Sequence, residues 1–417
     1  MLQKARTFLL NLLLFAVVLL LAYMLAEWAF LRVFPRLFPL EAVQKFDEPE
    51  GVWPVLQASK RGFLPQEDYI ALLGDSYAMG MGDAMLAAGR DRQPRFHSAH
   101  DIQQLTGRDV VSFGLPGSGS VRGMVGNPVA GLHYLRSMVD ERFPDPAWVV
   151  VYFYEGNDLT ENVMYHDRTF PLASAAVQAA GLAGFPDYVR EVVLGRQHLA
   201  LAADAAGREQ RQFLWRYGNR VVGEKLLGRK YFRKKYPGEL GLVYVPEQRW
   251  QPHQTDEPTN LARIDGQTVA LPDNLQGPAL DLTEAQLHQA VGIFSQSLAW
   301  SRAHFPQARF AVVYIPSVLS VYELIGERVS AQDYFRDQPV SATSGQLQQR
   351  HDAIRAGVAR ICHEQGVAFA DATADLRQAA AGAILHGPQD WNHFNRRGYR
   401  VLGESVVRQL PAFAEQP

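Results

Sequence analysis

The sequence predicts an α/β domain of the doubly wound type, with a parallel sheet, an apolar N-terminal helix before it and an insertion inside it. Three apolar runs, at residues 69–73, 110–113 and 148–154, each lead into a glycine. Continuous apolar strands of this kind are covered on both faces, as in a parallel sheet. Helix-compatible stretches such as 97–105 and 132–141 lie between the runs. This alternation of strand and helix predicts a doubly wound sheet.

The N-terminus predicts a helix that can cross a membrane. From residue 8 to residue 26 the sequence is apolar apart from Asn11. A helix of this length is about 28 Å long, close to the hydrocarbon thickness of a bilayer. A cleaved signal peptide is the alternative, but its apolar region is shorter and a small-x-small site follows it. Here Trp28 and Arg32 form an aromatic and basic border, which favours a retained anchor.

These features assign residues 1–31 to a cytoplasmic tip and a transmembrane anchor. Lys4 and Arg6 precede the apolar run and favour a cytoplasmic N-terminus. We therefore expect a single-pass protein of the inner (cytoplasmic) membrane whose folded domain faces the periplasm or the cell exterior. Residues 32–65 carry several prolines and glycines without a clear period and are expected to form a linker.

The folded domain is expected to span residues 66–410. An insertion at about 166–280 interrupts it, because this stretch is rich in Gly, Pro and polar residues. Helical patches occur there at 186–205 and 208–227.

The α/β pattern resumes beyond the insertion. Thr283 and Gln286 form a capping box in front of a long helix that is expected to reach residue 304. The remaining elements are expected to be a strand at 309–315, a helix at 345–365 and a strand at 367–370.

Composition limits the classes of function. The chain has 417 residues and a net charge of −2, so no overall charge draws it to nucleic acid. The single cysteine, Cys362, excludes an internal disulfide and a Cys-based zinc site, and it fits the cytoplasm or the periplasm equally well. No metal or cofactor is expected, because several histidines lack ligand spacing with carboxylates. They are His97, His100, His166 and His386.

Four short polar clusters fall at or beyond strand ends or in the last loop. They occupy residues 74–77, 114–117, 156–158 and 390–393. In open α/β sheets the functional groups lie at the carboxyl ends of the strands. We therefore expect the four clusters to meet in one site.

The residue types in these clusters suit a nucleophilic serine. Ser76 follows a strand directly, and a serine hydroxyl needs a base that accepts its proton and an acceptor that orients the base. His393 can be that base, and Asp390 can hold its far ring nitrogen. The oxyanion formed on attack needs hydrogen-bond donors. The backbone N–H groups of Ser76 and Gly117 and the side-chain amide of Asn157 are the candidates.

The clusters resemble the four blocks of the SGNH hydrolases, also called the GDSL family, in the family's order. The blocks read Gly-Asp-Ser at 74–76, glycines at 114 and 117, Gly-Asn-Asp at 156–158 and Asp-x-x-His at 390–393. The resemblance implies a three-layer α/β/α fold. It also implies that the site residues are Ser76, Gly117, Asn157, Asp390 and His393.

Some residues depart from the family pattern. Tyr77 stands where the family name has Leu, and Ser112 stands where the second block often has Asn. Gly114 competes with Gly117 as the oxyanion donor. No Gly-x-Ser-x-Gly surrounds Ser76, which argues against an α/β-hydrolase elbow. Each cluster alone has a plain structural interpretation, such as a Gly-Asp-Ser turn or a helix start capped by Asp390.

Three functions fit these residues. The first is an ester hydrolase that removes acyl groups, most plausibly acetyl, from an envelope glycan or lipid. The second is an O-acetyltransferase that passes the acyl group to an exopolysaccharide or cell-wall sugar beside a membrane-bound O-acyltransferase, as the resemblance suggests. The two differ only in the nucleophile that attacks the acyl-enzyme, which is water in the first and a sugar hydroxyl in the second. The third is a non-catalytic binding or scaffold protein on the same fold.

A basic stretch at 225–235 interleaves lysines and arginines with aromatic residues. It could contact anionic lipid or an acidic glycan. A solvated helix face in the insertion is the favoured interpretation.

Overall fold

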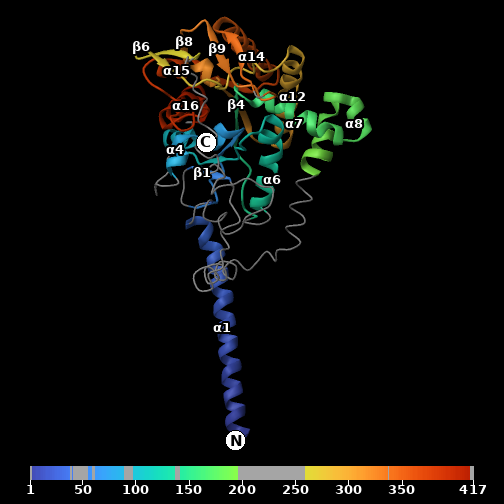
Figure 1. The fold of residues 1–417 in the computed structure, drawn as a ribbon. Coiled ribbons are helices and arrows are strands. Elements are labelled where there is room, and N and C mark those ends of the chain that lie inside the picture. The colour runs from blue at the N-terminus through green and yellow to red at the C-terminus, as the bar shows by residue number, and fades with distance from the viewer. Residues whose placement is uncertain are drawn as a thin grey trace.

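A computed structural model describes residues 2–37, 40, 55–58, 62–88, 97–136, 141–195, 259–336 and 338–413. It contains a six-stranded sheet flanked by helices, so the predicted α/β fold is confirmed (Figure 1). The strand order is β1-β3-β2-β4-β7-β11. The strands are β1 (Leu56–Ala58), β2 (Ile70–Leu73), β3 (Val110–Ser112), β4 (Trp148–Tyr154), β7 (Arg309–Ile315) and β11 (Ala368–Asp371).

Five of these strands are parallel, and in chain order they follow the arrangement 2-1-3-4-5 of flavodoxin-like sheets. The chain begins in the middle of the sheet at β2, moves to β3 on one side, and then crosses to β4 on the other. The connections from β2 and β4 therefore leave the sheet in opposite directions. A crevice at the carboxyl ends of these two strands is where such folds bind ligands.

Helices cover both faces of the sheet, and the alternation of side chains along each strand explains why. In β4, Val149 and Val151 belong to one apolar core, whereas Val150 and Tyr152 belong to the other. Figure 1 shows α6, α7 and α12 on one side of the sheet and α16 on the other. The first core is packed by α6 (Asn127–Tyr134), α7 (Asp158–Thr169), α12 (Glu284–His304) and α14 (Ser344–Glu364), and the second by α5 (Ser98–Thr106), α15 (Thr373–Ala380) and α16 (Arg396–Gln409).

The long helices begin where the sequence predicts. The capping box before α12 is present: the Thr283 side chain accepts from the Gln286 N–H, and the Gln286 side chain accepts from the Thr283 N–H. Thr343 and Gln346 form the same motif before α14. The stretch expected to be helical at 132–141 overlaps α6, which begins at Asn127 after a π-helical turn, η1 (Val121–Gly126), and ends at Tyr134. Residues 137–140 lie outside the described residues.

The segment expected to be a linker, residues 32–65, requires a correction. Helix α1 (Leu2–Leu37) continues into it, and β1 pairs antiparallel with β3 at the edge of the main sheet. The sheet is therefore mixed. A strand of three residues is too short to show an alternating pattern, and its pairing depends on a partner more than fifty residues later, at Ser112.

The described parts of the expected insertion pack against the domain. Helix α7 runs on to Thr169, and Val177, Phe185 and Tyr188 belong to the first apolar core. These lie in or near short helical turns: η3 (Phe170–Leu172), α8 (Ala175–Ala180), η4 (Gly181–Gly184), α9 (Phe185–Tyr188) and η5 (Val189–Leu194). The basic stretch 225–235 and the helical patch 208–227 lie outside the described residues.

Two small sheets and several short helices complete the described chain. One sheet has the order β6-β5-β8 and the other pairs β9 with β10. Their strands are β5 (Leu261–Ile264), β6 (Gln267–Ala270), β8 (Glu323–Leu324), β9 (Arg328–Ala331) and β10 (Val340–Thr343). The short helices are α3 (Ser76–Met79), α4 (Asp83–Ala88), α13 (Val318–Val321) and η7 (Pro411–Phe413).

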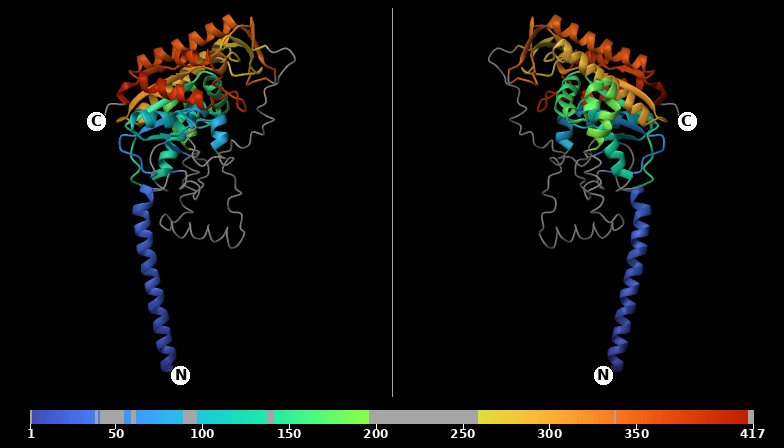
Figure 2. Two further views of the ribbon diagram at one scale, coloured as in Figure 1. Left: turned by 90° about the vertical axis from the view of Figure 1, so that its left-hand side faces the viewer. Right: turned by 90° about the vertical axis from the view of Figure 1, so that its right-hand side faces the viewer.

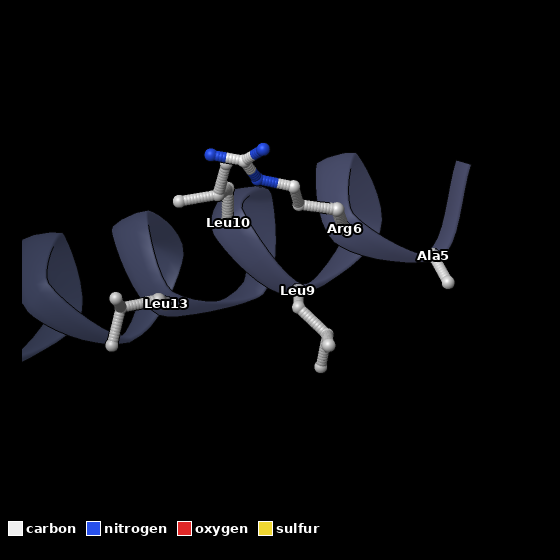
Figure 3. Close-up of a pocket in the computed structure, with 5 residues that line it drawn as sticks. All are labelled: Ala5, Arg6, Leu9, Leu10 and Leu13. Carbon is white, nitrogen blue, oxygen red and sulfur yellow. The ribbon is translucent and has the colours of Figure 1, made fainter. Parts of the chain in front are cut away.

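Helix α1 projects away from the α/β domain (Figures 1 and 2). Its stretch Gln3–Phe30 is long and apolar enough to cross a membrane, and none of its most apolar window is buried. Figure 3 shows Leu9, Leu10 and Leu13 projecting from the helix near Arg6. Each of these three leucines is more than half exposed. A surface this apolar is suited to contact with lipid rather than water.

A buried carboxylate holds the end of β4, directly before the predicted Gly-Asn-Asp cluster. Glu155 is fully buried. Its Oε1 accepts the Tyr314 hydroxyl at 2.7 Å and lies 2.7 Å from His351 Nδ1, while Oε2 accepts the Ser317 N–H at 2.7 Å. Burial by itself would raise the pKa of Glu155, but the hydrogen bond and charge of His351, together with the other donors, hold the pKa below its usual value.

We predict that Glu155→Gln lowers the free energy of unfolding by about 3 kcal/mol, because it removes one member of a buried, hydrogen-bonded set. Urea unfolding of the full chain in detergent, followed by circular dichroism, measures this. The control is Glu323→Gln, since Glu323 is 65% exposed and lies 3.8 Å from Arg263. That change is expected to have little effect.

Because the pKa of Glu155 is lowered in the fold, the difference between Glu155→Gln and wild type should shrink as the pH falls below about 4. Equal free energies of unfolding for Glu155→Gln and the wild type at pH 7 would contradict the prediction.

Candidate active site

The structure brings Ser76, His393 and Asp390 together. His393 Nε2 lies 2.8 Å from Ser76 Oγ, and His393 Nδ1 lies 2.6 Å from Asp390 Oδ2. Ser76 and His393 are 317 residues apart in the sequence. All three residues are buried, with exposures of 3%, 4% and 6%. These distances allow proton transfer between the hydroxyl and the imidazole, with the carboxylate on the other ring nitrogen.

The Gly-Asp-Ser turn places Ser76 at the end of β2. Gly74 has φ +138°, and a Cβ there would lie 2.6 Å from the Tyr152 carbonyl oxygen, so the chain can approach β4 this closely only with glycine. Asp75 then caps the short helix α3, because its Oδ1 accepts the Tyr77 N–H at 2.8 Å. Ser76 is the first residue of α3 and lies at the carboxyl edge of the sheet.

The loop that carries Asp390 and His393 is held from three directions. Asp83 Oδ1 accepts the Asp390 N–H at 2.7 Å. The Asn392 carbonyl accepts the Tyr77 hydroxyl at 2.8 Å, and Asn392 Oδ1 accepts the Gln276 N–H at 3.3 Å. The loop is therefore fixed to α4, to α3 and to the segment before α12.

The charges around His393 favour its protonated form. Burial alone would lower the pKa of His393, but the charge and hydrogen bond of Asp390 and the charge of Asp75 outweigh burial and raise it. In the neutral ring, a proton on Nδ1 directed at Asp390 leaves Nε2 as an acceptor for the Ser76 hydroxyl. This is the tautomer that a general base needs.

The two glycines that compete as oxyanion donors differ in the structure. The Gly114 N–H donates to Ser112 Oγ at 3.2 Å, and Gly114 is buried against α3. Gly117 is exposed, with φ +61°. Only Gly117 therefore presents its backbone toward the outside of the fold.

Asn157 lies at the start of α7 and is buried, with an exposure of 5%. Its Oδ1 has no hydrogen-bond partner within the described part of the chain. Its side chain lies near the Asp75 carboxylate, the neighbour of Ser76, and favours the ionised form of that carboxyl. The amide is therefore beside the turn that carries the nucleophile.

Several residues around the site were not predicted from the sequence. Tyr154 donates to Gln276 Oε1 at 2.7 Å, and Gln276 Nε2 donates to the Tyr334 hydroxyl at 2.5 Å. Glu161 lies one turn beyond Asn157 on α7, and a Cβ on Gly117 would lie 3.9 Å from its Oε1. Burial raises the pKa of Glu161 to about 7, against the opposing charge of Arg122. Of these residues, only Glu161 could have been found from the sequence, because it follows Asn157 at the spacing of one helical turn.

Two other acidic residues have the structural roles expected of them. Asp75 Oδ1 accepts a backbone N–H, as noted, and Asp158 Oδ2 accepts the Tyr154 N–H at 2.9 Å. Among the described residues, no group of three His, Cys, Asp or Glu side chains could hold a metal ion. His97 accepts the Ala99 N–H at the start of α5, and His386 pairs with the Tyr322 hydroxyl at 2.9 Å.

No family model and no curated protein matches this chain. Among solved structures, the chain is similar to an extracellular lipase from Streptomyces rimosus. The two share 15% sequence identity over 83% of this chain and 99% of the lipase chain, with a TM-score of 0.34. A likeness this low carries no weight for the reaction, so the chemistry rests on the geometry of the site itself.

We predict that Gly114→Ala and Gly117→Ala have unequal effects on stability. A Cβ at Gly114 would overlap the backbone of Met79 and Ala78 in α3, which should cost about 2 kcal/mol or more. A Cβ at Gly117 meets nothing closer than 3.9 Å, so only its positive φ is strained, at about 1 kcal/mol. Thermal unfolding of the two variants measures the difference. A Gly114→Ala protein as stable as the wild type would show that α3 does not approach Gly114 this closely.

Proposed function

We propose that this chain is a serine ester hydrolase of the SGNH/GDSL type that acts through an acyl-enzyme on O-acyl groups, chiefly acetyl, of an envelope glycan or lipid. One observation carries the proposal: Ser76 Oγ, the His393 ring and the Asp390 carboxylate form a continuous hydrogen-bonded chain. Four sequence clusters in the order of that family, on a flavodoxin-like sheet, support the same assignment.

In the proposed reaction, Ser76 Oγ attacks the acyl carbonyl carbon while His393 Nε2 takes the hydroxyl proton. The carbonyl π electrons move to oxygen, and the Gly117 N–H, the Ser76 N–H and the Asn157 amide stabilise the oxyanion. The ester C–O bond then breaks, and the leaving alcohol takes the proton from the imidazolium. Water repeats the sequence on the acyl-enzyme and releases the acid and Ser76. Asp390 keeps the ring oriented and stabilises its positive charge.

Acyl transfer to a sugar hydroxyl is the second candidate, because only the nucleophile that attacks the acyl-enzyme differs between the two reactions. A sugar hydroxyl bound beside Ser76 would then resolve the intermediate in place of water. The donor for such a reaction would come from a membrane-bound O-acyltransferase.

The first test is turnover of p-nitrophenyl acetate by the full chain in detergent, with and without a sugar acceptor. Ser76→Ala and His393→Ala should each lower kcat by roughly four or more orders of magnitude while the fold is retained. Because both residues act in one proton transfer, the double variant should be no slower than either single variant.

The control for this test is Ser98→Ala, a buried serine that hydrogen-bonds the Tyr152 hydroxyl at 2.8 Å, has no part in the proposed reaction and should keep its activity. Wild-type activity in Ser76→Ala would exclude the serine mechanism and would favour a binding or scaffold role. Acetylated sugar in the acceptor arm, at the expense of free acetate, would favour the transferase.

We further propose that α1 remains as a single-pass anchor in the cytoplasmic membrane and that the α/β domain faces the periplasm or cell exterior. A C-terminal alkaline phosphatase fusion should therefore be active, because that reporter needs an oxidising compartment. The N-terminus of the mature protein should begin before residue 8. If only a cytoplasmic reporter were active, the proposed orientation would be wrong. A mature chain that starts after residue 26 would identify a cleaved signal peptide.

A further inference from the structure

The Ser76 hydroxyl has two acceptors in the structure. His393 Nε2 lies 2.8 Å from Ser76 Oγ, and Asp75 Oδ2 lies 3.2 Å from the same oxygen. A serine hydroxyl carries one proton and can donate it to only one acceptor at a time. The protonation state of His393 therefore determines which acceptor receives it.

Two arrangements follow from this geometry. When the imidazole is neutral and its proton is on Nδ1, Nε2 accepts the Ser76 proton, and the hydroxyl is ready for attack. When the imidazole is protonated, both ring nitrogens are donors. Ser76 Oγ then accepts from Nε2–H and turns its own proton to Asp75 Oδ2. The Asp75 carboxylate thus completes the hydrogen bonding of the inactive, protonated arrangement.

The Asp75 carboxylate can act as this acceptor at pH values above about 6. It is 1% exposed, and burial raises its pKa to about 6, although the Tyr77 N–H, His393, Ser76 and Asn157 all favour the carboxylate. Burial and the charge of Asp75 raise the pKa of its neighbour Asp158 well above the usual value. Of these two buried carboxyls, Asp158 is therefore the one whose neutral form is further favoured by a charged neighbour.

We propose that Asp75 is a positioning residue that receives the Ser76 proton in the inactive arrangement and thereby sets the pH at which the enzyme becomes active. This inference rests on the proposed function of Ser76. It assigns a second carboxylate to the His393 ring: Asp75 acts on the Ser76 side, and Asp390 acts on the other side.

Other titratable groups also lie close to Asp75 and His393 and affect the pKa values of both. Asp390 and His386 face His393 from its own segment, and the Tyr77 ring lies 5.4 Å from the His393 ring. Asp75 is faced from α7, β4, α16 and the loop after β9. The groups on those elements are Asp158, Glu161, Tyr154, Tyr399 and Tyr334.

The test measures the titration of His393 directly, by hydrogen–deuterium exchange of the imidazole C2 hydrogen and mass spectrometry on the full chain in detergent. Asp75→Asn removes the charge and keeps an oxygen for the Tyr77 N–H. It should lower the His393 midpoint by about one pH unit, because a nearby carboxylate no longer stabilises the imidazolium. Asp158→Asn is the matched control. It replaces a buried carboxyl that is not among the groups that shift the pKa of His393, so it should leave the midpoint within about 0.2 units.

A second variant separates charge from hydrogen bonding. Ser76→Ala removes only the bridging hydroxyl, so it should also lower the His393 midpoint, by less than Asp75→Asn does. An unchanged His393 midpoint in Asp75→Asn and in Ser76→Ala would overturn the proposal.

Turnover supplies a second readout. In Asp75→Asn the acid limb of the kcat/KM profile for p-nitrophenyl acetate should move to lower pH with the imidazole midpoint. A uniform loss of activity with an unmoved limb would indicate a merely structural role. Because the imidazole titration needs no turnover, a wild type without Ser76-dependent activity would refute the proposed function without affecting this measurement.

Discussion

The two hydrogen bonds of the His393 ring join the beginning and the end of the α/β domain, and the proposed chemistry requires both. One partner, Ser76, stands in the first turn after β2, and the other, Asp390, lies in the loop before α16. A shift of 1 Å in either would break the proton path. The structure prevents this by fixing the loop through Asp83, Tyr77 and Gln276, none of which takes part in the reaction. The short helix α3 contributes twice, because it carries Ser76 and also holds the loop through Tyr77.

The same small region concentrates several carboxyls around one imidazole. Asp75 and Asp390 both raise the pKa of His393, and Asp158 and Glu161 lie close enough to interact with Asp75. Water screens these groups poorly, because Asp75, Asp158 and Asp390 are buried and Glu161 is partly buried. Each carboxyl therefore changes the protonation of the next. The sheet topology causes this crowding. Asp75 follows β2 and Asp158 follows β4, and these strands are adjacent and parallel.

The N-terminal helix and the α/β domain are connected more closely than a free tether would allow. Leu40 belongs to the first apolar core, and Phe30 packs against that core. The edge strand β1 then adds the segment at 56–58 to the sheet itself. If α1 is a retained anchor, the domain would be held near the membrane surface, where an envelope glycan or lipid is within reach.

The sequence by itself determined the α/β class and the approximate positions of the main strands, and it singled out Ser76, His393 and Asp390, which the structure brings together. These features depend on local chemistry. Apolar runs that stop at glycine, the capping box at Thr283 and the Gly-Asp-Ser turn are visible within a few residues. Only the tertiary structure decided what depends on contacts between distant segments. It paired β1 with β3, gave the Gly114 N–H to Ser112, and placed Asp75 against the Ser76 hydroxyl. It also brought Gln276 and Tyr334 to the site from separate loops. Such pairings depend on which surfaces the folded chain brings together, and they cannot be inferred from the spacing of residues along the sequence.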